Sequence, residues 1–176
     1  MGSIEVLWDM KNCTDYIVSS PAEVPAKGIL NTTALKILSK NCDLETRLSL
    51  LCDSYIDQSS GSISGQSISV MRTSDIKNLA KELKAIKKID LFNSSEYPYY
   101  PFRLQKVFFD LRTFLNSIGY GLIYDKNVMY SKGVNIGDYS GSGLSIFIPL
   151  EDNERYQQSY KSLPWNQYAH WLEKFE

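Results

Sequence analysis

The sequence predicts an α/β fold in which helices cover both faces of a β-sheet. Two observations support this class. Segments with apolar residues at helical spacing alternate along the chain with short apolar runs that end at proline, glycine or serine. In addition, 176 residues with 43% apolar and 22% charged side chains are enough to bury the core of one domain. We therefore expect a single domain over residues 1–176.

Composition excludes several classes of function. The formal net charge is −1 with both signs interspersed, which argues against a nucleic-acid surface and its basic stripe. The three cysteines, Cys13, Cys42 and Cys52, lack CxxC spacing, and His170 is the one histidine, so we expect neither a zinc site nor any other cofactor. We expect the thiols to be buried or half-buried on helices. No run of about 18 apolar residues exists, so no membrane span is expected.

The first thirty residues predict a helix, a strand and a loop. Residues 3–12 have helical spacing with Ser3 as the N-cap, and residues 16–19 form an apolar run typical of a covered, parallel strand. Pro21 and Pro25 stop regular pairing, and Gly28 permits a tight backbone turn.

The middle of the chain continues the alternation. Helices are predicted over residues 33–39 and 44–57, followed by a strand over 67–72. Ser74 is the expected N-cap of the next helix, whose buried stripe runs from Ile76 to Ile86. The aromatic and proline-containing stretch 92–102 predicts a packed loop, with a partner-binding surface as the alternative.

The last third predicts one long helix, three strands and a final helix. Residues 103–118 carry a continuous apolar face and end before Gly119, so they predict the clearest helix of the chain. Short strands are expected at 121–124 and 128–130 and a further strand at 144–149. Pro164 opens the final helix.

The residues by themselves predict no catalytic centre. His170 lies in a segment that is typical of packing, and Cys13 lies at the end of a helix, where a thiolate is not favoured. The stretch DYSGSG precedes a strand, whereas a phosphate-binding loop follows one, and no G-x-S-x-G nucleophile turn occurs. Glu151 and Asp152 indicate a solvated turn.

Four stretches, in order, resemble clostripain-like cysteine peptidases. MGSIEVLWDMKNCTDYIVSSPAEVP resembles the segment that directly follows the catalytic cysteine of that family. Residues 67–89 are similar to its next strand and helix, and FDLRTFL at 109–115 to the start of a later helix. SGLSIFIP at 142–149 and YKSLPWNQYAHWLEKF at the C-terminus are similar to its closing strand and tryptophan-bearing helix.

The resemblance implies a caspase-like α/β fold and a cysteine endopeptidase that cleaves after arginine or lysine. It implies that the catalytic His and Cys both lie upstream of residue 1, so that this chain is the C-terminal portion of the peptidase domain and is inactive alone. The implied partners are a peptide or protein substrate and the missing N-terminal half. Family members are commonly exported, so an extracellular or cell-envelope location is implied.

The resemblance also implies a wall of the substrate pocket at the end of the first strand. That wall comprises Ser19, Ser20, Pro21 and Glu23, running on through Val24, Pro25 and Ala26 to Lys27 and Gly28. A basic substrate side chain needs a fixed carboxylate in such a pocket, because a buried unpaired cation is costly.

Lys27 departs from the family at this loop. The family commonly places an acid just before the glycine, where this sequence has Lys27, and like charge would repel a basic substrate. Either Glu23 substitutes as the pocket acid, or the preference has shifted from basic residues, or Lys27 points to solvent. Two further functions stay open: a non-catalytic binding module that keeps the groove, and a regulatory partner supplied in trans.

Overall fold

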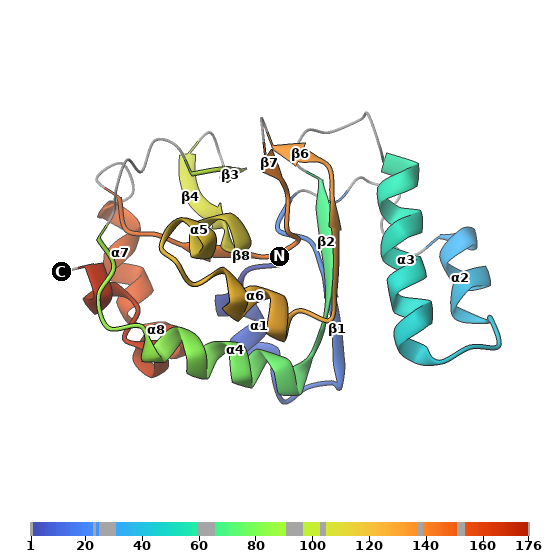
Figure 1. Ribbon diagram of the computed structural model, residues 1–176, viewed down its shortest axis with the longest axis horizontal. Coiled ribbons are helices and arrows are strands. Elements are labelled where there is room, and N and C mark those ends of the chain that lie inside the picture. Colours follow the sequence, from blue (N-terminus) through green and yellow to red (C-terminus); the bar gives the residue numbers. More distant parts are fainter. Residues whose placement is uncertain are drawn as a thin grey trace.

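The computed structural model describes residues 2–22, 24, 31–59, 66–90, 97–102, 105–136, 139–150 and 154–175 (Figure 1). Helices and strands alternate along it, and the α/β fold class expected from the sequence is confirmed. Among the described residues, no helix is both long and apolar enough to cross a membrane.

Eight α-helices and a final 3-10 helix are present in the described residues. The α-helices are α1 Ile4–Met10, α2 Thr32–Leu38, α3 Leu44–Ser59, α4 Thr73–Ala85, α5 Leu111–Ser117, α6 Gly121–Asn127, α7 Glu154–Lys161 and α8 Pro164–Ala169, and the 3-10 helix is Leu172–Phe175. The strands are β1 Tyr16–Ser19, β2 Ser67–Arg72, β3 Tyr99–Phe102, β4 Gln105–Asp110, β5 Tyr130–Gly133, β6 Asn135–Ile136, β7 Tyr139–Ser140 and β8 Ser145–Phe147.

The strands form two three-stranded sheets and one two-stranded hairpin. The orders are β1-β2-β5 and β3-β4-β8, with β6 paired to β7. In Figure 1 the first sheet is seen nearly edge-on, with α2 and α3 on one side and the other helices across from them. Every pairing of these strands is antiparallel, so the parallel orientation expected for Tyr16–Ser19 is wrong: β1 runs against β2 with Ser19 opposite Ser69.

The larger hydrophobic core lies around the β3-β4-β8 sheet. It joins residues of α1, α4, α5 and α8 and is rich in aromatic rings. Its largest fully buried side chains include Trp165, Trp171, Phe109, Phe114 and Phe147. The expected buried faces of α1 and α4 are confirmed, because Ile4, Leu7 and Leu79 are at most 1% exposed.

A smaller core lies between α3 and the β1-β2-β5 sheet. Leu48, Cys52 and Tyr55 of α3 pack on Ile68 and Val70 of β2. The other face of β2 is also buried, because Ser67 and Ser69 are 0% exposed. The alternating polar and apolar side chains of β2 therefore point to opposite faces of the sheet, and both faces are buried.

The long helix predicted for residues 103–118 is wrong in its first half. Gln105–Asp110 is strand β4, and α5 covers only Leu111–Ser117. Val107, Phe108 and Phe109 fit both the helical and the strand period of apolar residues. This segment forms a strand because it pairs with β3 on one side and with β8 on the other. The end of α5 is as expected, because Gly119 adopts a left-handed conformation with φ +80°.

Other boundaries also differ from expectation. Residues 121–124 form the start of helix α6 instead of a strand, since Ile123, Tyr124 and Asn127 bury at helical spacing. The expected 128–130 strand starts at Tyr130 as β5. Part of the predicted aromatic loop is strand β3, residues 97–98 lie outside any helix or strand, and residues 92–96 lie outside the described residues. Helix α7 was not predicted.

Two helix ends also differ from expectation. Ser74 lies inside α4, whose N-cap is Arg72, so its expected capping role is wrong. The final helix stops at Ala169, because His170 is left-handed with φ 50°, and the chain resumes as a 3-10 turn.

Candidate functional site

Four of the nine residues predicted for the pocket wall are described, namely Ser19, Ser20, Pro21 and Val24. Ser19 ends β1, and Ser20 and Pro21 follow it directly. Glu23, Lys27 and Gly28 lie outside the described residues, as do Pro25 and Ala26. Val24 is exposed.

Gly2 joins the end of β1 to the start of β8. Its N–H donates to the carbonyl of Ser20 at 2.7 Å, and its carbonyl accepts from the N–H of Ser145 at 2.9 Å. A Cβ at Gly2 would lie 2.8 Å from the carbonyl carbon of Ser20 and 2.9 Å from the nitrogen of Pro21, so a side chain has no room there. The segment before α1 is thus held between the two sheets at the candidate site.

Buried hydroxyl groups gather at this junction. Ser20 is 5% exposed, and its Oγ donates to the carbonyl of Ala22 at 3.2 Å. Ser19 Oγ and Ser145 Oγ are buried without a hydrogen-bond partner among the described residues. Buried hydroxyls normally find partners. These hydroxyl groups can donate to or accept from further polar groups, and none of them is hydrogen-bonded to a basic side chain among the described residues.

A buried carboxylate, Asp110, connects the two sheets through Tyr100 and Ser67. Asp110 Oδ2 accepts from Tyr100 OH at 2.9 Å and from the N–H of Ser142 at 2.7 Å, and Oδ1 accepts from the N–H of Thr113 at 3.0 Å. Tyr100 OH also lies 2.9 Å from Ser67 Oγ of β2. Burial and then the Asp110 charge raise the pKa of Tyr100 well above its ordinary value.

This network was not predicted from the sequence. The available signal was Asp110 itself, an acid directly before an amphipathic stretch, which is typical of an N-cap. It was missed because 103–118 was assigned to one helix, which placed Asp110 in its interior.

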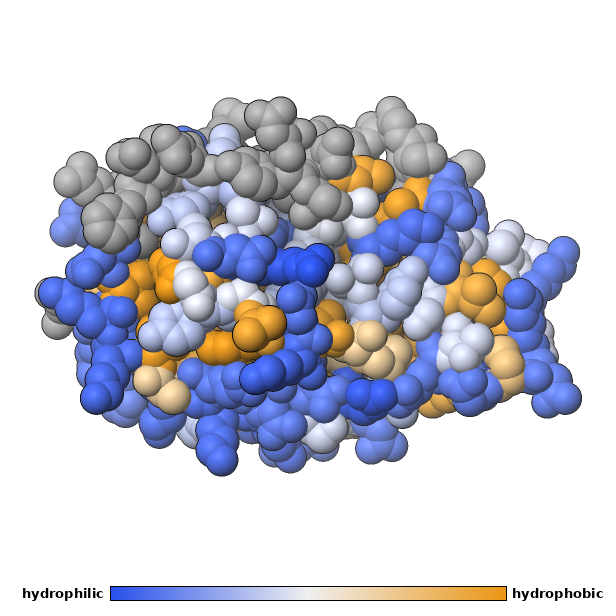
Figure 2. All heavy atoms as spheres, in the orientation of Figure 1, coloured by the Kyte–Doolittle hydropathy of each residue, from blue (hydrophilic) through white to orange (hydrophobic). Residues whose placement is uncertain are grey.

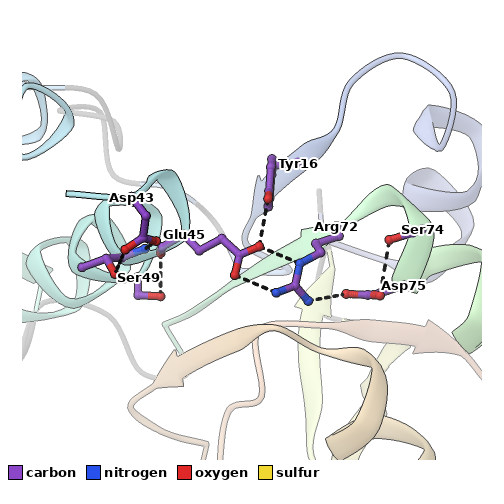
Figure 3. A network of polar contacts seen from close by, with 8 residues as sticks. Tyr16, Asp43, Glu45, Ser49, Arg72, Ser74 and Asp75 are labelled. Atoms are coloured by element: carbon purple, nitrogen blue, oxygen red, sulfur yellow. Dashed lines mark hydrogen bonds and ion pairs between the residues drawn. The ribbon is translucent and has the colours of Figure 1, made fainter.

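A polar network fastens the start of α3 to the sheet that leads into the site (Figure 3). Glu45 accepts two hydrogen bonds from Arg72, at 2.7 Å and 2.6 Å, and one from Tyr16 OH at 2.8 Å. Arg72 also pairs with Asp75 at 3.1 Å. The hydrogen bonds from Arg72 and then from Tyr16 lower the pKa of Glu45 below its ordinary value.

The other end of α3 is fastened as well. Lys132 of β5 lies 2.9 Å from Asp53, which also accepts from Tyr130 OH at 2.6 Å. Asn31 caps α2 through Ala34 and donates to Gln58 of α3 at 2.9 Å. The chain between Ser20 and Asn31 therefore starts at the end of β1 and ends at the N-cap of α2. Asn31 is bonded to α3, and α3 is held against the β1-β2-β5 sheet.

The cysteines and the histidine show no catalytic pairing among the described residues. Cys52 is buried, and burial raises the pKa of its thiol to about 12. Cys13 is exposed in the turn after α1, contrary to the expectation that all three thiols are at least half-buried on helices. His170 is also exposed, not packed, and its Nδ1 lies 3.1 Å from Glu173. The part of the chain that is described holds no group of three metal-binding side chains.

Solved structures with the same fold are bacterial cysteine proteases. A Bacteroides fragilis cysteine protease matches with a TM-score of 0.78 and 22% identity, over 100% of this chain and 86% of that chain. An inactive zymogen C11 protease from Parabacteroides distasonis matches with a TM-score of 0.72 and 21% identity, over 96% of this chain and 56% of that one. A secreted C11 cysteine protease from Bacteroides thetaiotaomicron, solved with an irreversible peptide inhibitor, matches with a TM-score of 0.73 and 21% identity, over 97% and 56%.

The fold is therefore that of the C11 cysteine proteases. The sequence also matches the model of the clostripain family over residues 1–97, which is more than half of the chain. The chain belongs to the clostripain family. No curated protein sequence matches it. The chain spans 86% of the B. fragilis chain, but 56% of the Parabacteroides chain and of the secreted B. thetaiotaomicron chain solved with an irreversible inhibitor.

Proposed function

We propose that this chain is part of a clostripain-type cysteine endopeptidase, to which it contributes the substrate-pocket strand and loop. The catalytic His and Cys are supplied by polypeptide outside residues 1–176, and the chain is inactive without them. The observation that carries this proposal is the position of Gly2, held by Ser20 on one side and by Ser145 on the other. In the family to which the chain belongs, polypeptide that enters at Gly2 would deliver the nucleophile beside the end of β1.

The arrangement around β1 supports a role in holding substrate. Ser19 Oγ is a buried polar atom without a partner among the described residues, and Ser20 precedes the loop that the resemblance assigns to the pocket. α3 holds the far end of that loop through Asn31 and Gln58. A loop with both ends fixed can present its side chains to a substrate at low entropic cost.

The direct test is hydrolysis of a fluorogenic peptide library with varied P1 residues. Residues 1–176 alone should show no turnover. The same chain extended by the in-frame upstream polypeptide should cleave, and alanine at its cysteine nucleophile should abolish cleavage. If the extended chain binds peptide but never cleaves, the protein is a non-catalytic binding module and the proposal fails.

The same library tests whether Glu23 serves as the pocket acid. If it does, Glu23→Ala in the extended chain should lower kcat/KM for arginine and lysine substrates by about 10-fold or more, because a buried cation would lose its partner. Glu154→Ala removes an exposed carboxylate from α7 and is the matched control. Strong arginine preference that survives Glu23→Ala would exclude Glu23 from this role.

A further inference from the structure

An apolar groove lies between α1 and α7, and we call it the α1–α7 groove. Strands β4 and β8 form its floor, and its volume is about 280 Å³. The apolar lining residues are Val6, Val107, Phe108, Phe147, Tyr156 and Leu163. This volume is large enough for a few side chains of a docked segment and small for a whole drug-sized ligand.

The ionisable carboxyl side chains among the described lining residues of the α1–α7 groove have no basic counterpart there. Glu5 and Asp9 of α1 line it, and no lysine, arginine or histidine is among its described lining residues. Glu5 Oε1 accepts from the N–H of Phe147 at 2.9 Å and from Tyr160 OH at 2.7 Å. Glu5 Oε2 is buried without a partner of hydrogen-bonding geometry in the described part of the chain. Burial raises the pKa of Glu5 above its ordinary value.

We propose that the α1–α7 groove is the docking site for the polypeptide that carries the catalytic dyad. This inference rests on the proposed function and identifies where its two parts meet. The docked segment presents apolar side chains to Phe108 and Phe147, and a cationic side chain to the Glu5 and Asp9 side of the groove. It buries an apolar surface that the described residues leave open.

Two observations favour this occupant. The chain spans 56% of each of two structures that share its fold, and 86% and 82% of two others, so each of those chains contains polypeptide beyond the shared part. The groove begins at Ser3, next to Gly2, where that polypeptide enters under the proposed function.

A second copy of this chain fits the groove poorly. In a two-fold symmetric dimer the same patch faces itself, so the interface would bring together Glu5 and Asp9 of both copies without a basic residue from the described lining. Like charges brought together in a dry interface cost free energy. The charge of the α1–α7 groove is complementary to a different, basic segment.

The test measures association between residues 1–176 and the separately expressed upstream polypeptide, by sedimentation velocity and calorimetry. Val6→Lys places a charge in the groove, and Asp9→Asn removes one from an exposed position that should not affect folding. Leu122→Lys is the matched control, because Leu122 is 71% exposed on α6, where Figure 2 shows apolar atoms at the surface. Circular dichroism checks that each variant is folded.

Val6→Lys should raise Kd by about 10-fold or more and Asp9→Asn by a smaller factor, while Leu122→Lys changes Kd less than about 2-fold. If peptidase activity is reconstituted but neither groove variant weakens association, the docking site is wrong and the proposed function stands. If the upstream polypeptide yields no peptidase, the proposed function fails and the inference with it. Self-association of residues 1–176 that Val6→Lys disrupts would identify a second copy as the occupant and overturn the inference.

Discussion

Two regions of the molecule are stabilised by different interactions. The aromatic region comprises the β3-β4-β8 sheet with α1, α4, α5 and α8, and it has a single large core. The α3 region comprises the β1-β2-β5 sheet with α3, and it has a small core and a set of ion pairs. Strand β1, which leads into the candidate site, therefore belongs to the region with less buried apolar surface.

Ring contacts dominate the first region. Phe114 lies 5.7 Å from Tyr97, 6.2 Å from Trp171 and 6.5 Å from Phe175, measured between ring centroids. In the α3 region the Arg72 and Glu45 side chains remain 40% and 38% exposed. Exposed ion pairs contribute little to stability and are screened by salt. We therefore expect the α3 region to open first.

The largest effect should come from emptying the aromatic core. Phe114→Ala should lower the free energy of unfolding by about 3–5 kcal/mol, because it removes a fully buried ring and leaves a cavity. Leu48→Ala in the α3 region should cost about 2 kcal/mol, at the lower end for such a change, since Leu48 is 8% exposed in a small cluster. Urea denaturation measures both. Equal losses would contradict the proposed difference between the regions.

A glycine pair tests the contact between the regions. Gly143 has φ +81°, and a Cβ there would lie 2.5 Å from the carbonyl carbon and oxygen of Ile68 in β2. Gly119 has φ +80° with nothing within 4 Å of its Cβ position. Gly119→Ala should therefore cost about 1 kcal/mol for backbone conformation alone, and Gly143→Ala clearly more, because the backbone of β2 must shift.

Thermal unfolding of the two alanine variants separates these contributions. A loss at Gly143 no larger than that at Gly119 would show that the segment before β8 is not packed tightly on β2.

The smallest effects should be opposite pH dependences in the two regions. Burial raises the pKa of Glu5 above its ordinary value of 4.5. The contribution of Glu5 to the free energy of unfolding is therefore fully present below pH 4.5 and is lost as the pH rises through the folded-state pKa. Arg72 and Tyr16 lower the pKa of Glu45 below its ordinary value of 4.5. The contribution of Glu45 to the free energy of unfolding is therefore present above pH 4.5 and is lost as the pH falls through the folded-state pKa.

Substitution by glutamine removes the ionisable carboxyl group at Glu5 or at Glu45. Relative to the parent chain, Glu5→Gln should gain stability as the pH rises, whereas Glu45→Gln should lose stability at neutral pH and match the parent in acid. Unfolding midpoints from pH 3 to 8 give the two difference curves. Parallel curves would contradict the assigned environments.

The sequence predicted those elements whose period and local signals agree. Strand β2 was predicted at its observed bounds, and the buried stripe of α4 follows the helical spacing of Ile76, Leu79 and Leu83. Helix α2 and strand β1 were also predicted within a residue of their observed bounds. In these segments, local preference and tertiary packing favour the same structure.

Residues 105–110 show why other elements could not be predicted. Val107, Phe108 and Phe109 continue the apolar face of α5 at helical spacing, yet they suit a strand equally well by side-chain type. The deciding interactions come from distant residues, because Phe108 pairs with Phe147 and Phe109 with Ile146 of β8. The direction of β1 likewise depends on its partner β2 and has no local signal.

The candidate site was predictable only in part. The position of Ser19, Ser20 and Pro21 at the end of a strand followed from the sequence. The convergence of Gly2 and Ser145 on that strand end requires contacts between distant segments. The Asp110 network required the correct end of β4 to be known. The roles of Glu23, Lys27 and Gly28 remain predictions.

The indole of Trp171 lies in the aromatic region and donates to the carbonyl of Phe147 at 2.7 Å. Trp8 and Trp165 lie in the same region. These are the three tryptophans of the chain. Intrinsic tryptophan emission will therefore report on one region and remain nearly silent when α3 detaches from its sheet. Far-ultraviolet circular dichroism, which registers helix α3, will detect that detachment. A denaturation profile in which the two signals separate would reveal the local opening without any added label.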